Sequence, residues 1–151
     1  MLKFLSDQTL LSLSLLYKSS VMEIEVFTLC DFAQDNGGKL TIVGTFDSIG
    51  TKKIPATHPS CAIATRLRFS EKEAGDHSFK LRLIDSERKE LIPPIEGNIN
   101  VRKPPNGQYG VINIVGNLNN LKFEKTGRYS FELFIDDEWK SGLPLIIYHT
   151  P

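Results

Sequence analysis

The chain has 151 residues, of which 40% are hydrophobic, and this length and composition fit one globular domain with a single core. Lys and Arg number 18 and Asp and Glu also number 18, so the formal net charge is zero. A chain without excess charge lacks the surface that attracts nucleic acid or anionic lipid non-specifically. We therefore expect neither nucleic acid nor a membrane among its partners.

Residues 1–21 read MLKFLSDQTLLSLSLLYKSSV and form an N-terminal extension to a predicted single domain at residues 22–151. Asp7 interrupts the apolar run and no A-x-A cleavage pattern follows, so the match to a secretory signal is poor. The segment is also too short and polar to span a membrane. Either translation starts at Met22, which we favour, or the segment forms a short helix with leucines near one face. We expect a cytoplasmic protein, and secretion is the minority interpretation, in which residues 1–21 act as a signal.

From Met22 onward, apolar residues alternate with period two and turn residues interrupt them at short intervals, which indicates consecutive antiparallel strands. No stretch has the pattern of a long helix. The predicted strands are residues 23–32, 39–49, 60–69, 77–85, 95–101, 109–118, 128–135 and 143–149. About eight strands predict an all-β fold, an antiparallel sandwich of two packed sheets.

The predicted strand at residues 128–135 carries the clearest architectural signal, because alternate residues from Tyr129 to Ile135 are apolar. The spacing Gly127-x-Tyr129-x-Phe131 resembles the tyrosine corner of immunoglobulin-like sandwiches, in which the tyrosine hydroxyl bonds back to the chain entering the strand. Phe131 stands where antibody domains place a cysteine, so their inter-sheet disulfide is not expected. The general architecture is predicted to be immunoglobulin-like, with the strand order open.

The segment CDFAQDNGGKLTIVGTFD, residues 30–47, contains a hairpin signal, because a two-residue turn needs the positive φ that Asn-Gly or Gly-Gly provides. Either dipeptide as the turn centre pairs odd residues of the first strand with even residues of the second. Cys30 and Asp31 then point to opposite sides of the sheet and form no reactive pair unless a bulge intervenes. Asp31 is the lone charge on an apolar face, so we expect a bulge near Asp31 or Gly44, a strand end or a hydrogen-bond donor to relieve it.

Other candidate sites are weak, and no group of residues specifies a reaction. Cys30 has no histidine placed beside it by a motif, and a buried core residue is the favoured interpretation. His58 and Cys61 have an H-x-x-C spacing, but zinc normally takes three or four ligands. Cys30 and Cys61 form one disulfide or, as we favour, stay free and buried. We expect no catalytic residue, no metal and no cofactor.

Two loops and three aromatic residues complete the survey. The acidic loop at residues 136–138 lacks the spacing of a calcium loop, and the glycines at 37–38 precede a strand where a phosphate loop would precede a helix. Tyr109, Trp139 and Tyr148 are candidates for a sugar- or peptide-binding face, although isolated aromatics more often complete a core.

Three segments together, CDFAQDNGGKLTIVGTFD, HPSCAIATRLRF at residues 58–69 and IPPIEGNINV at residues 92–101, resemble a known family. It is an uncharacterised bacterial domain-of-unknown-function family whose members are compact β-sandwich proteins. The resemblance covers about residues 22–148, and so favours Met22 as the start. It implies a fold, and it implies no activity, cofactor or catalytic residue.

The favoured function is a non-enzymatic interaction or assembly module that binds another protein or itself, through loops at one end or an exposed strand edge. The alternative is a small-ligand or carbohydrate binder, and a hydrolase using Asp31 with aromatic neighbours is a further one. The candidate ligand or partner surface comprises Asp31, Asp35, Asn36, His58, Lys103, Asn106, Asp136, Asp137 and Trp139.

Overall fold

The computed structural model describes residues 22–105 and 109–151, which form nine strands and one short 3-10 helix. Residues 1–21, with their predicted short helix, and Asn106 lie outside the described residues. The elements are β1 Glu23–Asn36, β2 Lys39–Thr45, β3 Ser48–Thr51, β4 Ala56–Ser70, η1 Glu71–Glu73, β5 Gly75–Ile84, β6 Ile95–Val101, β7 Tyr109–Phe123, β8 Gly127–Ile135 and β9 Glu138–His149.

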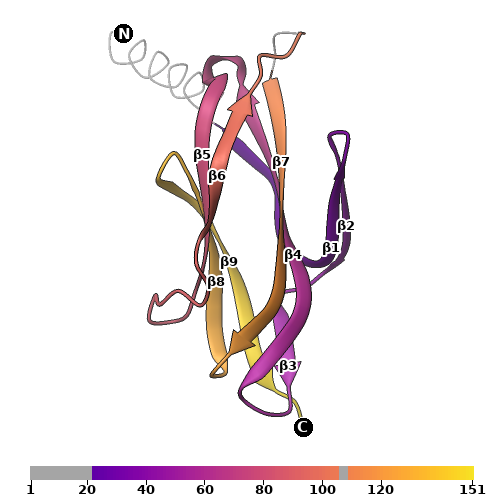
Figure 1. Cartoon of the computed structure of the whole chain (residues 1–151), viewed down its shortest axis with the longest axis vertical. Coiled ribbons are helices and arrows are strands. Elements are labelled where there is room, and N and C mark those ends of the chain that lie inside the picture. Colours follow the sequence, from indigo (N-terminus) through magenta and orange to yellow (C-terminus); the bar gives the residue numbers. More distant parts are fainter. Residues whose placement is uncertain (1–21, 106–108) are drawn as a thin grey trace, which may run out of the picture.

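The strands form two sheets, which confirms the all-β, two-sheet prediction (Figure 1). One sheet has the order β2-β1-β4-β7 and the other has the order β3-β9-β8-β5-β6. Among the described strands, the neighbours pair antiparallel except β3 and β9, which are parallel from Ser48–Ile146 to Thr51–His149. The expectation of wholly antiparallel sheets is therefore wrong at this edge.

The predicted strand at residues 39–49 is two strands in two different sheets. β2 ends beside β1, and β3 begins beside β9. The chain crosses at Phe46, whose N–H still donates to the carbonyl of Leu29 at 3.0 Å, and Asp47, whose carbonyl accepts from the N–H of Ile146 at 2.9 Å. The alternating sequence conceals this crossing, because β2 and β3 have the same period-two pattern although Ile42 of β2 packs against the cluster around Cys30 and Ile49 of β3 packs against the main core.

β1, β4, β7 and β9 extend beyond their predicted ranges. A His-Pro pair before a strand predicts a turn, but His58 and Pro59 lie inside β4. The pairing of β4 with β7 skips Pro59, which lies opposite Asn120, a residue with a φ of 52°. Proline has no N–H to donate, and an irregular position of this kind accommodates it within a strand.

β1 and β2 form the predicted hairpin, with Gly37 and Gly38 as its two-residue turn at φ values of 60° and 87°. Odd residues of β1 pair with even residues of β2, as predicted, for example Ala33 with Ile42. Cys30 is 0% exposed whereas Asp31 is exposed. The two side chains therefore form no reactive pair.

The β1–β2 hairpin folds back over the outer face of its own sheet. β1 pairs with β4 up to Cys30 and with β2 from Cys30 onward, and Figure 1 shows the hairpin bent away from the first half of β1. Cys30 and Ala33 pack against alanines of β4 in a second, smaller hydrophobic cluster. At the tip, Arg66 Nη1 and Asn113 Nδ2 donate to the carbonyl of Gly38 at 3.2 Å and 3.1 Å.

The bend places Asp31 against Gly44 on β2. Gly44 has a φ of 68°, and a Cβ added there would lie 2.5 Å from Oδ2 of Asp31. Only glycine fits both the backbone conformation and the contact. The Asp31 carboxylate is turned outward into solvent at this irregularity, which is one of the expected forms of relief.

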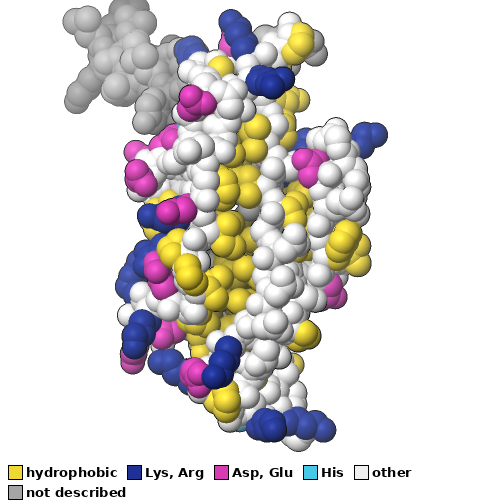
Figure 2. All heavy atoms as spheres, viewed as in Figure 1, with side chains coloured by type: hydrophobic (Ala, Val, Ile, Leu, Met, Phe, Trp, Pro, Cys, Tyr) yellow, Lys and Arg dark blue, Asp and Glu magenta, His cyan; other side chains and the backbone are white. Residues whose placement is uncertain are grey.

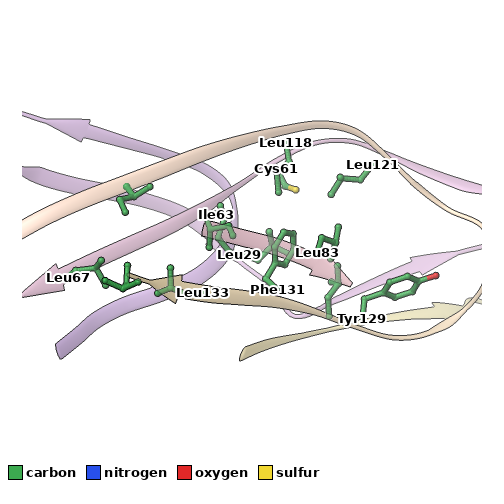
Figure 3. Packing of buried hydrophobic residues seen from close by; sticks show 14 of the residues in the cluster. Leu29, Cys61, Ile63, Leu67, Leu83, Leu118, Leu121, Tyr129, Phe131 and Leu133 are labelled. Atoms are coloured by element: carbon green, nitrogen blue, oxygen red, sulfur yellow. The ribbon is translucent and has the colours of Figure 1, made fainter. Parts of the chain in front are cut away.

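The main core lies between the two sheets. Figure 3 shows Leu29 and Ile63 of one sheet close to Phe131 and Leu133 of the other. Burying each such side chain contributes about 1.5–3 kcal/mol. The largest fully buried side chains of this core include Leu29, Ile63, Leu67, Phe69, Leu83, Phe123, Phe131, Leu133, Leu145 and Ile147.

Tyr129 packs at the start of β8, where it joins the core to the preceding turn. Its hydroxyl donates to the carbonyl of Lys125 at 2.6 Å, and its ring meets Phe123 edge-to-face with centroids 5.0 Å apart. The predicted bond from this tyrosine to the chain entering the strand is confirmed.

The two sheets leave an apolar opening between their edge strands β6 and β7. Figure 2 shows a band of hydrophobic side chains along this side of the molecule. Ile99 and Ile112 are half-buried against the main core here, and a recess of about 270 Å³ lies between Val101 and Gly110.

We predict that Gly44→Ala lowers the free energy of unfolding by more than about 2 kcal/mol, because positive φ and the Asp31 contact both oppose a Cβ. Gly37→Ala is the matched control, since φ is 60° there and a Cβ meets no atom within 4 Å; its cost should be about 1 kcal/mol. Urea unfolding measures both variants, and equal losses would contradict the proposed contact.

We predict that Tyr129→Phe lowers the free energy of unfolding by about 1 kcal/mol, because the hydroxyl loses its bond to Lys125 while the ring remains. Tyr109→Phe, at a side chain 47% exposed, should change stability by less than about 0.5 kcal/mol. Equal urea midpoints for Tyr129→Phe and the unmodified protein would show that the bond contributes nothing.

Candidate functional site

Asp35 and Asn36, predicted as surface site residues, build the hairpin tip. Asp35 Oδ1 accepts the N–H of Gly38 at 2.9 Å and an amide hydrogen of Asn113 at 3.4 Å. Asn36 is the last residue of β1 and pairs with Lys39. Both residues are exposed, and the bonds of Asp35 hold the folded-back hairpin in place.

The two cysteines are free and buried, as favoured from the sequence. Cys61 belongs to the main core, whereas Cys30 lies in the small cluster under the hairpin. Burial raises the pKa of the Cys61 thiol to about 11 and also raises the pKa of Cys30. Both thiols are therefore protonated at neutral pH, which makes them poor nucleophiles.

His58 is half-buried within β4 and packs against Phe46, with ring centroids 5.6 Å apart. Its Nε2 is buried and has no hydrogen-bond partner among the described residues. Within residues 22–105 and 109–151, no three His, Cys, Asp or Glu side chains lie close enough together to hold a metal ion.

The predicted site residues do not share one end of the molecule. His58 lies near the start of β4, while η1 follows the other end of that strand. Lys103 is an exposed loop residue whose Nζ lies 2.6 Å from Oε1 of Glu71 in η1. Asp136 also reaches the η1 end, through the histidine described next.

His77 of β5 joins three segments at this end. Its Nδ1 lies 2.6 Å from Oδ2 of Asp136, and its Nε2 lies 2.6 Å from the carbonyl of Glu73. Asp136 Oδ1 also accepts the N–H of Ser78 at 3.0 Å. The histidine ring packs on Phe69, with centroids 4.9 Å apart. Sequence reasoning did not select His77, because the partners lie at least four residues away in the chain.

The contacts of the His77 ring favour its doubly protonated form. Burial lowers the pKa of His77, but the bonds to Asp136 and to the Glu73 carbonyl outweigh it, so the pKa is raised overall. Burial likewise raises the pKa of Asp136, and the bonds from His77 and Ser78 reverse this, so its pKa is lowered. A carbonyl oxygen only accepts, so Nε2 must carry a proton, and the carboxylate partner favours a proton on Nδ1.

Asp136 and Asp137 form the two-residue turn between β8 and β9, at φ values of 52° and 63°. Two residues beyond the turn, Trp139 lies opposite Phe134, and residues paired across antiparallel strands point to the same face. Trp139 therefore lies on the outer face of the five-stranded sheet, where it is 57% exposed.

Ile146 and Tyr148 continue this face along β9. They pair with Ser48 and Gly50 of β3 and are 39% and 47% exposed. Ile146 lies outside the surface predicted from the sequence, whose residues were expected mostly on loops. The segment LPLIIYH at residues 143–149 could have indicated this surface. If its alternate residues Leu143, Leu145 and Ile147 point into the core, Ile146 and Tyr148 must point outward.

No helix among the described residues has the length and apolar character needed to cross a bilayer.

We predict that His77→Asn removes a pH dependence of stability. The folded-state pKa of His77 is raised, so its contribution is fully present below about pH 6.5 and is lost as pH rises through the folded-state value. Urea unfolding of the unmodified protein should therefore show falling stability across that range. His149→Asn, at an exposed position on β9, should retain the fall. The same slope in His77→Asn would contradict the assignment.

Comparison with known proteins shows the family of this chain. No curated protein matches the chain. Among solved structures, a β-glucosidase from Listeria innocua in complex with isofagomine is similar at 9% identity and a TM-score of 0.46, over 85% of this chain and 16% of that one. The alkylpurine DNA glycosylase AlkC from Pseudomonas fluorescens, bound to DNA containing an abasic site analog, is similar at 7% identity and a TM-score of 0.44, over 84% and 30%.

This chain therefore spans less than a third of either similar structure. The sequence pattern of DUF6941, a family of unknown function, matches residues 25–148 of this chain. That range contains most of β1, all of β2 to β8 and all but the last residue of β9. The resemblance to a β-sandwich family of unknown function is confirmed, and the chain belongs to the DUF6941 family.

Proposed function

We propose that this protein is a non-enzymatic binding module that recognises its partner with the outer face of the five-stranded sheet. The observation that supports this is the outward row of β9, which exposes Trp139, Ile146 and Tyr148. These are three of the six large hydrophobic side chains exposed among the described residues, and they share one strand. Large apolar side chains exposed along one strand are typical of interaction surfaces.

A protein partner is the first candidate, and the β3 end of the face supports it. The Tyr148 ring lies over Gly50, because a Cβ there would be 3.0 Å from its hydroxyl oxygen. Ile146 and the exposed Pro144 lie beside it. A tyrosine held flat beside aliphatic side chains has the character of a binding hot spot. Self-association of this chain would use the same residues.

A carbohydrate or other small ligand is the second candidate, and the other end of the face supports it. Trp139 Cζ2 lies 3.5 Å from where a Cβ of Gly142 would be, so the indole lies against the sheet beside a residue without a side chain. An exposed indole supplies a large apolar surface with one hydrogen-bond donor.

The immunoglobulin-like assignment is part of the same proposal. In that class the strand with the tyrosine corner lies between two neighbours of its sheet, and the opposite sheet has the strand order A-B-E-D. Here β8 carries Tyr129 and lies between β5 and β9, and β1, β4 and β7 support the A-B-E correspondence.

The free thiols of Cys30 and Cys61 suit a reducing compartment, which supports a cytoplasmic location.

We predict that Ile146→Lys weakens partner binding about tenfold or more, because it places a charge in the centre of the apolar row. Val43→Lys is the matched control, at an aliphatic residue 53% exposed on the β1–β2 hairpin. Affinity purification with the two variants and the unmodified protein identifies a partner, and analytical ultracentrifugation measures self-association. A partner or dimer that survives Ile146→Lys, or that is lost with Val43→Lys, would contradict the proposed surface.

A further inference from the structure

Glu132 is a buried carboxylate on the outer face of the five-stranded sheet. Its neighbours on β8, Phe131 and Leu133, point into the core, so Glu132 points the other way, and it is only 6% exposed. Its Oε2 is buried and has no hydrogen-bond partner among the described residues. Arg82 Nη1 lies 4.0 Å from Oε2, and Arg88 Nη2 lies 3.7 Å from Oε1. Both distances exceed those of a hydrogen bond, so the acceptor is unused.

Trp139 lies beside this carboxylate. Glu132 pairs directly with Gly142, and the Trp139 indole lies against Gly142. No side chain at Gly142 stands between the indole and the paired position of Glu132 on β8, and the indole is 57% exposed. One unused acceptor and one exposed apolar ring are therefore adjacent on a rigid sheet.

The surrounding charges select the kind of group that fits. A cationic ligand is opposed by Arg82 and Arg88, and an anionic ligand is opposed by Glu132 and by Glu90, which accepts from Arg82 Nε at 2.8 Å. These four charges sum to zero, and Lys80, whose Nζ lies over the Phe134 ring, adds one further positive charge to this face. A neutral ligand with a hydrogen-bond donor is repelled by neither pair of charges, and a ligand with a flat apolar face can stack on the indole. A pyranose ring has both, with C–H bonds on its faces and hydroxyl groups on its rim.

We infer that Trp139 and Glu132 form a subsite for a neutral sugar ring, which stacks on the indole and donates a hydroxyl hydrogen bond to Glu132 Oε2. The inference rests on the proposed binding role of this sheet face and names the ligand class of its Trp139 end. Oε2 is buried, so a neighbouring side chain has to move before a hydroxyl can reach it, and Arg82, whose Nη1 lies 4.0 Å away, is the cation nearest to it.

The subsite is separable from the protein-binding end of the same face. Trp139 pairs with Phe134 and Ile146 pairs with Arg128, so six residues of β8, or about 20 Å, separate them. Substitution at Ile146 therefore leaves the sugar subsite intact, and substitution at Glu132 leaves the Ile146 end intact.

The test titrates the full chain with neutral gluco-, manno- and chito-oligosaccharides at millimolar concentrations. The chain has one tryptophan, so its intrinsic fluorescence reports on Trp139 alone. We expect a saturable change that Glu132→Gln weakens about tenfold or more. Glu138→Gln, the same chemical change at an exposed residue of β9, and Ile146→Lys should both leave the affinity unchanged. Anionic uronic-acid oligomers should bind more weakly than the neutral sugars.

No fluorescence change with any neutral sugar, or equal affinity in Glu132→Gln, would overturn the subsite. If Glu132→Gln does not fold, Trp139→Ala provides the second measurement, by calorimetry, and unchanged sugar affinity there would also overturn it. Loss of a protein partner with Ile146→Lys while sugar binding persists would separate the two proposals.

Discussion

The rest of the structure depends on the inward row of alternate residues along β8. Tyr129, Phe131, Leu133 and Ile135 are each at most 3% exposed, so this strand has a single permitted face toward the core. A shift of one residue would expose these four apolar side chains and bury the residues between them, so the strand register is strongly specified. The same alternation turns Glu132 away from the core and toward the outer face, where β9 presents its apolar row.

Both ends of β8 are fastened by polar groups. At the start, the hydroxyl of Tyr129 bonds to the chain that enters the strand. At the finish, Asp136 bonds to His77 and Ser78 of β5, and the turn that follows leads directly to Trp139. The position of Trp139 on the sheet is therefore set by a hydrogen-bonded turn and does not depend on a free loop. A rigid position reduces the entropy that a bound partner would otherwise cost.

The β1–β2 hairpin is an addition to the two-sheet core and is held by weaker means. It rests on a small cluster around Cys30 and Ala33 and on hydrogen bonds at its tip from Arg66 and Asn113. The main core lies on the other side of the sheet. Local opening of the hairpin would therefore expose little apolar surface, whereas separating the sheets would expose most of it.

The sequence by itself determined the fold class, a hairpin turn within residues 36–38, the pairing parity of the first hairpin and the role of Tyr129, because each follows from period-two alternation or from local backbone requirements. Only the tertiary structure decided where the chain changes sheets at Phe46 and Asp47, since both halves of that segment have the same local pattern. It also decided the candidate site. His77 contacts Asp136, which is 59 positions away in the chain, and Glu132 lies opposite Arg82 by strand pairing. Contacts between residues so far apart in the chain cannot be predicted from the local sequence.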